Sequence, residues 1–303
     1  MNNKDIHQLL QKSVKDLSED YHSKYPFIPV YDKELPQNKA LEDILNIIRA
    51  IVFPGYFGSS LVNFGSLPYH TGVWVEKLYS TLSEQIFRTL TFNTESEDRC
   101  KTEEKACDLS LKFVSKLPRI KYLLSTDVKA IFNGDPAAKD YTEIIFCYPA
   151  MRALLNHRVA HELLKLNIPL IPRMMSEIAH AETGIDIHPG AQIGKYFSID
   201  HGTGVVIGQT AVIGKHVRLY QGVTLGAKSF SLDENGNPID IPRHPILEDY
   251  VTVYSNSSIL GRITIGEGTI VGGNVWLTHS VPPHSKILQS KAVESYFIDG
   301  LGI

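Results

Sequence analysis

The apolar residues of positions 1–183 recur at intervals of three and four, which places them on one face of an α-helix. Examples are the apolar residues within 41–48 and 153–164. Proline and glycine support this period: residues 53–55 are expected to stop one helix, Leu117-Pro118 to end another, and residues 133–136 to form a turn. We therefore expect an N-terminal α-helical domain of roughly six to eight helices.

From about residue 184 the spacing changes, and single aliphatic residues stand six positions apart. A period of six is typical of a parallel β-helix, a triangular prism in which each hexapeptide forms one side and its aliphatic residue points inward. Stacked coils pair their backbone groups in parallel ladders about 4.8 Å apart. We expect this prism over residues 184–285, with a core at Ile187, Ile193, Ile199, Ile207, Ile213, Leu219, Leu225, Leu247, Val253, Ile259, Ile265, Val271 and Leu277.

Two interruptions break the six-residue period. Two extra residues occur near 202–204, and a longer insertion rich in Gly, Asn, Asp and Pro covers 229–242. Because repeat proteins often carry binding sites on such loops, the insertion is a candidate lid or site wall, although an ordinary solvated loop is the alternative. The expected fold class is α+β, with a helical domain, a β-helix and a short C-terminal tail over 286–303.

Composition excludes several classes of protein. The 303 residues are 43% apolar and 21% charged, with a formal net charge of -3 and no long block of like charge, so we expect neither nucleic acid nor membrane as a partner. No run of eighteen apolar residues occurs, and the first residues are polar. Cys100, Cys107 and Cys147 form no CxxC pair, which favours a reducing compartment, and we expect a cytoplasmic protein.

Several motifs resemble one family. They are DIHP at 186–189, IDHGTGVVIG at 199–208, QGVTLG at 221–226 followed by RHP at 243–245, and, more weakly, DPA at 135–137. This set resembles the serine O-acetyltransferases, which are hexapeptide-repeat acyltransferases. The resemblance implies a left-handed parallel β-helix that transfers acetyl from acetyl-CoA to L-serine. The product would be O-acetyl-L-serine, in the first step of cysteine biosynthesis.

The chain also departs from the family pattern. It has Gly226-Ala227 where relatives commonly have two glycines, and Tyr254 where they have small residues. Its insertion at 229–242 is longer than in the most familiar members. These differences concern the CoA groove rather than the reaction.

The proposed reaction needs a base for the serine hydroxyl, and histidine is the natural choice. His201 follows Asp200 at the kink in the repeat, where a side chain can project from the prism. Asp186 lies fifteen residues earlier, close to one coil of eighteen, so it can reach the histidine from the coil below and orient it. The resemblance assigns the same roles to His201 and Asp186.

The resemblance also implies how the substrates are bound. Arg243 would bind the serine carboxylate, Asp135 and Asp200 would accept from its ammonium group, and His244 would hold it near the hydroxyl. The alternative, without the resemblance, is that Arg243 forms an ordinary salt bridge and that Asp135 is a turn-forming residue. The positions aligned with the CoA groove are Gly226, Ala227, Lys228, Ser255 and Gly273.

Partners are implied by the resemblance as well. A homotrimer or a dimer of trimers is expected, with active sites between subunits. L-Cysteine is a possible feedback inhibitor. Ile303 matches a C-terminal isoleucine that inserts into O-acetylserine sulfhydrylase in this family, although a frayed terminus or a groove-capping strand is the alternative.

Three other functions compete with this one. A sugar or xenobiotic O-acetyltransferase would share the histidine and CoA but would not need Asp135, Asp200 and Arg243 around a small zwitterion. A zinc enzyme on the same fold would need a third histidine beside His279 and His284, so no metal is expected. A non-catalytic scaffold would have a damaged pair of catalytic residues, whereas both are present.

Overall fold

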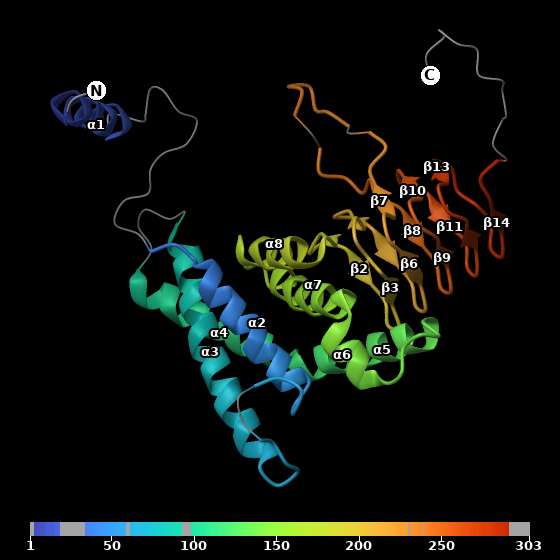
Figure 1. The fold of residues 1–303 in the computed structure, drawn as a ribbon, viewed down its shortest axis with the longest axis horizontal. Coiled ribbons are helices and arrows are strands. Elements are labelled where there is room, and N and C mark those ends of the chain that lie inside the picture. The colour runs from blue at the N-terminus through green and yellow to red at the C-terminus, as the bar shows by residue number, and fades with distance from the viewer. Residues whose placement is uncertain are drawn as a thin grey trace. The chain divides into compact units, whose positions relative to one another are not determined.

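The computed structural model describes residues 3–18, 34–58, 61–92, 98–229, 231–237 and 239–290. Ile303 and most of the tail lie outside these residues. The chain forms two compact units, residues 1–35 and 36–303. The described residues contain eight helices (Figure 1): α1 (Asn3–Ser18) in the first unit, then α2 (Asn38–Val52), α3 (Leu67–Phe92), α4 (Arg99–Val114), α5 (Leu117–Gly134), α6 (Tyr141–Cys147), α7 (Pro149–Lys165) and α8 (Ile171–Thr183) in the second.

Helices α2 to α8 share one apolar core, with α7 at its centre. Twelve of the seventeen residues of α7 are buried, so this helix is covered on nearly every side. One expectation about a helix end was wrong. Leu117-Pro118 begins α5 instead of ending a helix, because proline is accepted in the first turn, where its missing N–H is not needed.

In the described residues, fourteen short parallel strands follow the helices. They are β1 (Asp186–Ile187), β2 (Gln192–Ile193), β3 (Ser198–Asp200), β4 (Val206–Ile207), β5 (Val212–Ile213), β6 (Arg218–Tyr220), β7 (Thr224–Gly226), β8 (Ile246–Leu247), β9 (Thr252–Val253), β10 (Ser258–Leu260), β11 (Thr264–Ile265), β12 (Ile270–Val271), β13 (Trp276–Leu277) and β14 (Lys286–Ile287). Up to β13 every third strand is a neighbour, and β14 pairs with β12. This gives a first sheet of β1-β4-β7-β10-β13, a second of β2-β5-β8-β11 and a third of β3-β6-β9-β12-β14. The predicted helical half and parallel β-helix are therefore confirmed.

The core of the prism follows the six-residue pattern. Of the thirteen expected inward positions, all except the partly buried Ile193 are at most 3% exposed. The prism also continues beyond the expected limit of 285, because β14 pairs with β12. The spacing shortens to four residues between Leu277 and the buried Val281, which pairs with Ile265, so the last coil no longer follows the period.

Two of the three edges of the prism carry site residues that were predicted from the sequence. The turns that join the third sheet to the first are residues 201–205, 221–223, 254–257 and 272–275, and we call them the His201 edge. The turns that join the first sheet to the second are residues 188–191, 208–211, 227–245 and 261–263, and we call them the Arg243 edge. The insertion 229–242 belongs to the latter and leaves the prism between β7 and β8, apart from Phe230 and Pro238, which are outside the described residues.

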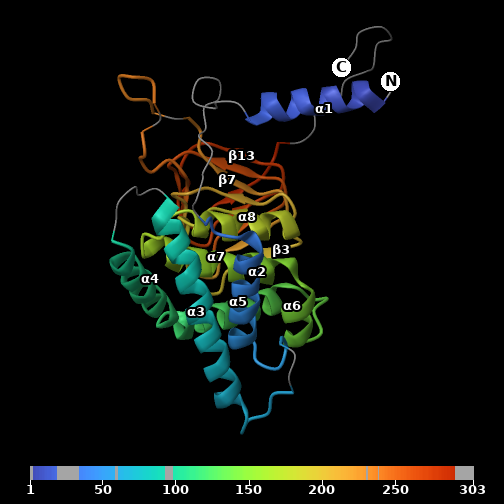
Figure 2. The same ribbon diagram turned by 90° about the vertical axis from the view of Figure 1, so that its left-hand side faces the viewer.

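A buried ion pair joins the helices to the prism. Arg158 on α7 donates to both carboxylate oxygens of Asp127 on α5, at 2.6 and 2.8 Å, and both side chains are at most 4% exposed. Arg158 also donates to the carbonyls of Ile193 and Gly194, and the N–H of Phe197 donates to Asp127. In Figure 2, α7 lies against the first coil, in agreement with the contacts of α7 with β1 and β3. This junction fixes α5, whose end leads to Asp135, against β3 and the turn that precedes it.

Among the described residues, no helix is both long and apolar enough to cross a membrane. The cytoplasmic location stays a prediction.

Candidate active site

A cavity of about 430 Å³ lies where the end of α5 and the start of α7 meet the His201 edge. Its lining includes Asp135, Tyr148, Asp200 and His201. The sequence predicted three of these four as site residues. Helical and solenoid residues separated by more than fifty positions thus meet in one cavity, which supports a shared role.

His201 projects from the prism because of its backbone conformation. Its φ of 55° is in the left-handed region, and the glycines at 202 and 204 that follow it also have positive φ. The side chain is 73% exposed, and its Nε2 lies 3.9 Å from Oδ1 of Asp200. The two extra residues of the sequence therefore form the corner that presents this imidazole.

Asp186 points outward from β1, on the coil where the sequence expected it. Its Oδ1 is buried and has no hydrogen-bond partner among the described residues. No hydrogen bond joins Asp186 to His201 in this part of the chain, and the exposed His201 ring turns toward Asp200 instead. Asp186 therefore retains an acceptor for an imidazole N–H, whereas its pairing with His201 stays a prediction.

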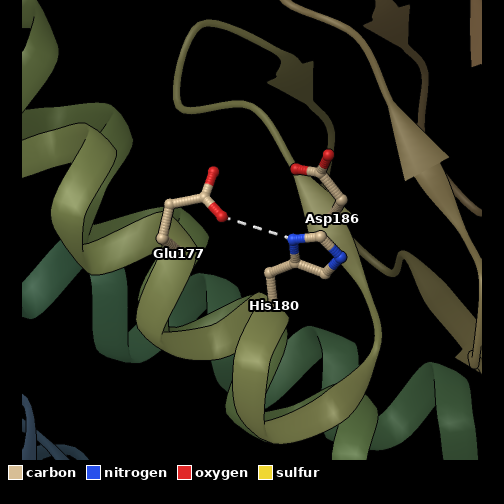
Figure 3. Close-up of side chains that lie close together, drawn as sticks. All are labelled: Glu177, His180 and Asp186. Carbon is tan, nitrogen blue, oxygen red and sulfur yellow. Dashed lines mark hydrogen bonds and ion pairs between the residues drawn. The ribbon is translucent and has the colours of Figure 1, made fainter.

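A second imidazole lies beside Asp186. Figure 3 shows the carboxylate of Glu177 turned toward His180 on α8, with Asp186 beside the ring, and Nδ1 of His180 lies 3.3 Å from Glu177. These three residues are the one group in the described ranges whose possible metal-ligating atoms gather within 4.8 Å. The zinc-enzyme alternative depended on His279 and His284, and neither belongs to this group.

Asp135 is held by two donors after the end of α5. The N–H of Ala137 donates to its Oδ1 at 2.8 Å, and the hydroxyl of Tyr148 donates to its Oδ2 at 2.5 Å. The Tyr148 hydroxyl bond and the Ala137 N–H bond lower the pKa of Asp135, and the same carboxylate raises the pKa of Tyr148 to about 12. The sequence did not single out Tyr148, because a tyrosine before a proline carries no local mark of this contact.

Arg243 and His244 lie on the other edge, directly after the insertion. Arg243 donates from Nη2 to the side chain of Gln209 at 2.9 Å, and its Nη1 lies 3.6 Å from Asp240. The ring of His244 covers Gly208, where a Cβ would lie 1.9 Å from the ring, so only glycine fits there. The absence of a side chain at Gly208 lets the His244 ring lie against this turn of the Arg243 edge.

His244 is a neutral hydrogen-bond donor. Its Nδ1 accepts the backbone N–H of Thr210 at 3.2 Å, so the ring proton lies on Nε2. Burial, together with the nearby charge of Arg243, lowers its pKa to about 4. His188 on the same edge has the same arrangement, because its Nδ1 accepts from the N–H of Gly190. The sequence motif contained His188, but nothing in it indicated this role.

The predicted site residues therefore divide between two edges. Asp135, Asp200 and His201 gather at the His201 edge, whereas Arg243 and His244 lie at the Arg243 edge. The first sheet separates the two edges, because each of its strands runs from one to the other. A side six residues long spans up to about 20 Å, so a single prism does not bring these groups around one serine.

The residues aligned with the CoA groove divide in the same way. Gly226 ends β7, and Ala227 and Lys228 begin the longest turn of the Arg243 edge, whereas Ser255 and Gly273 lie on the His201 edge. Ser255 and Gly273 occupy neighbouring coils, since a Cβ on Gly273 would lie 3.3 Å from the Ser255 carbonyl oxygen. A groove built from all five residues would therefore need two prisms.

No protein-family model matches the chain. It is 47% identical over 275 residues to a plasmid-encoded serine acetyltransferase of Synechococcus elongatus, an alignment that covers 89% of this chain and 86% of the relative. Serine acetyltransferase 1 of Entamoeba histolytica, solved with L-cysteine, shares 34% identity and a TM-score of 0.71 over 93% of this chain and 96% of that one. The soybean serine acetyltransferase solved with serine shares 28% identity and a TM-score of 0.53 over 83% and 96% of the two chains.

Proposed function

The chain belongs to the serine acetyltransferase family, and from this membership we propose how its own residues transfer acetyl from acetyl-CoA to the hydroxyl of L-serine. The family and the acyltransferase class expected from the sequence are confirmed by relatives similar over most of the chain. Acetyl-CoA is the co-substrate that the family implies. The observation that carries the proposal is the cavity that places two carboxylates beside the exposed imidazole of His201.

In this proposal the cavity binds the ammonium group of serine. Asp135 and Asp200 both accept from it, and two carboxylates in one small cavity favour a cation over a neutral sugar hydroxyl. Arg243 binds the carboxylate of the substrate through its guanidinium group. His244 donates from Nε2 toward the bound substrate, since its Nδ1 is already engaged by Thr210.

His201 acts as the general base of the transfer. It removes the hydroxyl proton while the serine oxygen attacks the thioester carbon, and the carbon–sulfur bond breaks as the tetrahedral intermediate collapses. The imidazolium then returns its proton to the departing CoA thiolate, so no net proton is gained or lost. Asp186, whose Oδ1 has no other partner among the described residues, stabilises the imidazolium by accepting its far N–H.

A thiol-release assay tests the activity directly. Purified protein with acetyl-CoA is expected to release thiol with L-serine but not with D-serine, homoserine or a sugar. L-Cysteine is expected to compete with L-serine, because it carries the same ammonium and carboxylate groups. Turnover with the sugar alone would instead support the other O-acetyltransferase alternative.

The site is completed by a second copy of the chain. We place the His201 edge of one subunit against the Arg243 edge of the next, in a homotrimer. The reason is that the predicted serine-binding residues and the residues aligned with the CoA groove are each divided between these two edges. Closed rotational symmetry then gives three equivalent sites per ring. Association of two trimers through the helical domains remains part of the proposal.

Mixing two inactive variants tests this arrangement. His201→Ala and Arg243→Ala are each expected to be nearly inactive. When the two variants are refolded together in equal amounts, they should recover about a quarter of the wild-type activity. Random assortment of subunits leaves both His201 and Arg243 intact at about one site in four. The assay is thiol release before and after mixing. Recovery near zero, with trimers confirmed by ultracentrifugation, would show that both residues must come from one chain.

The proposed contact with O-acetylserine sulfhydrylase involves Ile303, which lies outside the described residues. Deletion of Ile303 is expected to weaken binding to the sulfhydrylase at least tenfold in calorimetry, while serine acetylation continues at the wild-type rate. Equal affinity of the wild-type and Ile303-deleted proteins for the sulfhydrylase would exclude this contact.

A further inference from the structure

We propose that Tyr148 is a positioning residue for substrate binding: its hydroxyl orients Asp135, so that this carboxylate accepts from the ammonium group of the acceptor. The inference rests on the proposed function and adds a residue that the family motifs did not indicate. Tyr148 acts through Asp135 and needs no contact with the reacting atoms.

The backbone around Tyr148 is held on both sides. Its N–H donates to the carbonyl of Ile144 at the end of α6, and Pro149 begins α7 directly after it. The φ and ψ of Tyr148 are -84° and 119°, the extended conformation favoured before proline. Two helices therefore determine where this partly buried ring lies, and its hydroxyl reaches across the cavity to Asp135.

The hydroxyl and the Ala137 N–H determine how the Asp135 carboxylate is oriented. One donor binds each oxygen, at 2.5 Å to Oδ2 and 2.8 Å to Oδ1. Each carboxylate oxygen has a second lone pair, and these remain for a substrate N–H. Since the carboxylate cannot rotate without losing a bond, its remaining acceptors keep a constant direction.

Asp135 lies near other ionisable side chains. Asp200 and His201 line the same cavity from the prism, and Glu143 lies on α6 near Tyr148. Burial opposes ionisation of Asp135, because it removes water from the charged carboxylate. The Tyr148 hydroxyl counters this by binding the charged form, and it is the largest cause of the lowered pKa of Asp135. The Tyr148 hydroxyl therefore stabilises the same charged form of Asp135 that an ammonium group would bind.

Tyr148→Phe removes the hydroxyl and leaves the ring. Calorimetry on the full-length assembly is expected to show about tenfold weaker L-serine binding, as for the loss of one hydrogen bond to a charged group. KM for L-serine should rise by the same factor, with kcat and KM for acetyl-CoA within twofold. Tyr141→Phe is the matched control, because Tyr141 is exposed, lies outside the cavity lining and packs its ring against Phe132.

A double-mutant cycle separates this role from simple packing. In an Asp135→Asn background, Tyr148→Phe is expected to change the L-serine affinity less than twofold, because no carboxylate remains for the hydroxyl to orient. An equal tenfold loss in both backgrounds would assign Tyr148 to packing and overturn the inference. Unchanged serine binding by Tyr148→Phe would overturn it too, whereas a wild-type chain that does not bind L-serine would contradict the proposed function first.

Discussion

Replacement of His201 by alanine is expected to lower kcat for serine acetylation by about a thousandfold, within the range known for loss of a general base. The serine hydroxyl is a poor nucleophile near neutral pH, and among the described residues no other imidazole lines the cavity that holds Asp135 and Asp200. Binding of L-serine should change much less, since both carboxylates remain. Steady-state kinetics and calorimetry on the same preparation measure the two effects.

His279→Ala is the comparison for this experiment. His279 belonged to the zinc-enzyme alternative, is exposed, and lies outside the cavity, so its replacement is expected to leave kcat within twofold of wild type. Loss of activity in His279→Ala, together with an active His201→Ala, would contradict acyl transfer with His201 as the general base. It would also return the zinc alternative to consideration.

Replacement of Asp127 by alanine is expected to lower the free energy of unfolding by about 3–5 kcal/mol, because it leaves the guanidinium of Arg158 buried without its counter-charge. The Asp127 side chain is fully buried, and that of Arg158 is 4% exposed. The Phe197 N–H also loses its acceptor. Urea unfolding followed by circular dichroism measures the change, and serine turnover should fall with it because this junction positions α5 and therefore Asp135.

Asp108→Ala supplies the matched control on α4. Its carboxylate lies 2.6 Å from Lys112, as close as Asp127 lies to Arg158, but both side chains are more than half exposed. Solvent screens such pairs, so the expected loss is below about 0.5 kcal/mol. Similar losses of unfolding free energy in the two variants would show that burial does not determine how much the Asp127–Arg158 pair contributes to stability.

Much of this protein was determined by its sequence alone. The six-residue spacing identified the prism and nearly all of its inward residues, because every side of a β-helix repeats the same local requirement for an aliphatic side chain. The helical half was identified for the same reason, from apolar residues three and four apart. The two extra residues near 202–204 marked the corner that presents His201, since an insertion interrupts the period wherever it occurs.

The tertiary structure alone decided which distant residues meet. The hydroxyl of Tyr148 reaches Asp135, thirteen residues away across α6, and His180 lies beside Asp186 although one belongs to a helix and the other to a strand. The division of the predicted site residues between two edges became visible only when the strands of the first sheet were placed between His201 and Arg243. A periodic pattern of apolar residues shows which face of each helix or strand must be buried. Contacts between elements depend on how helices and coils pack, and this leaves no regular spacing in the sequence.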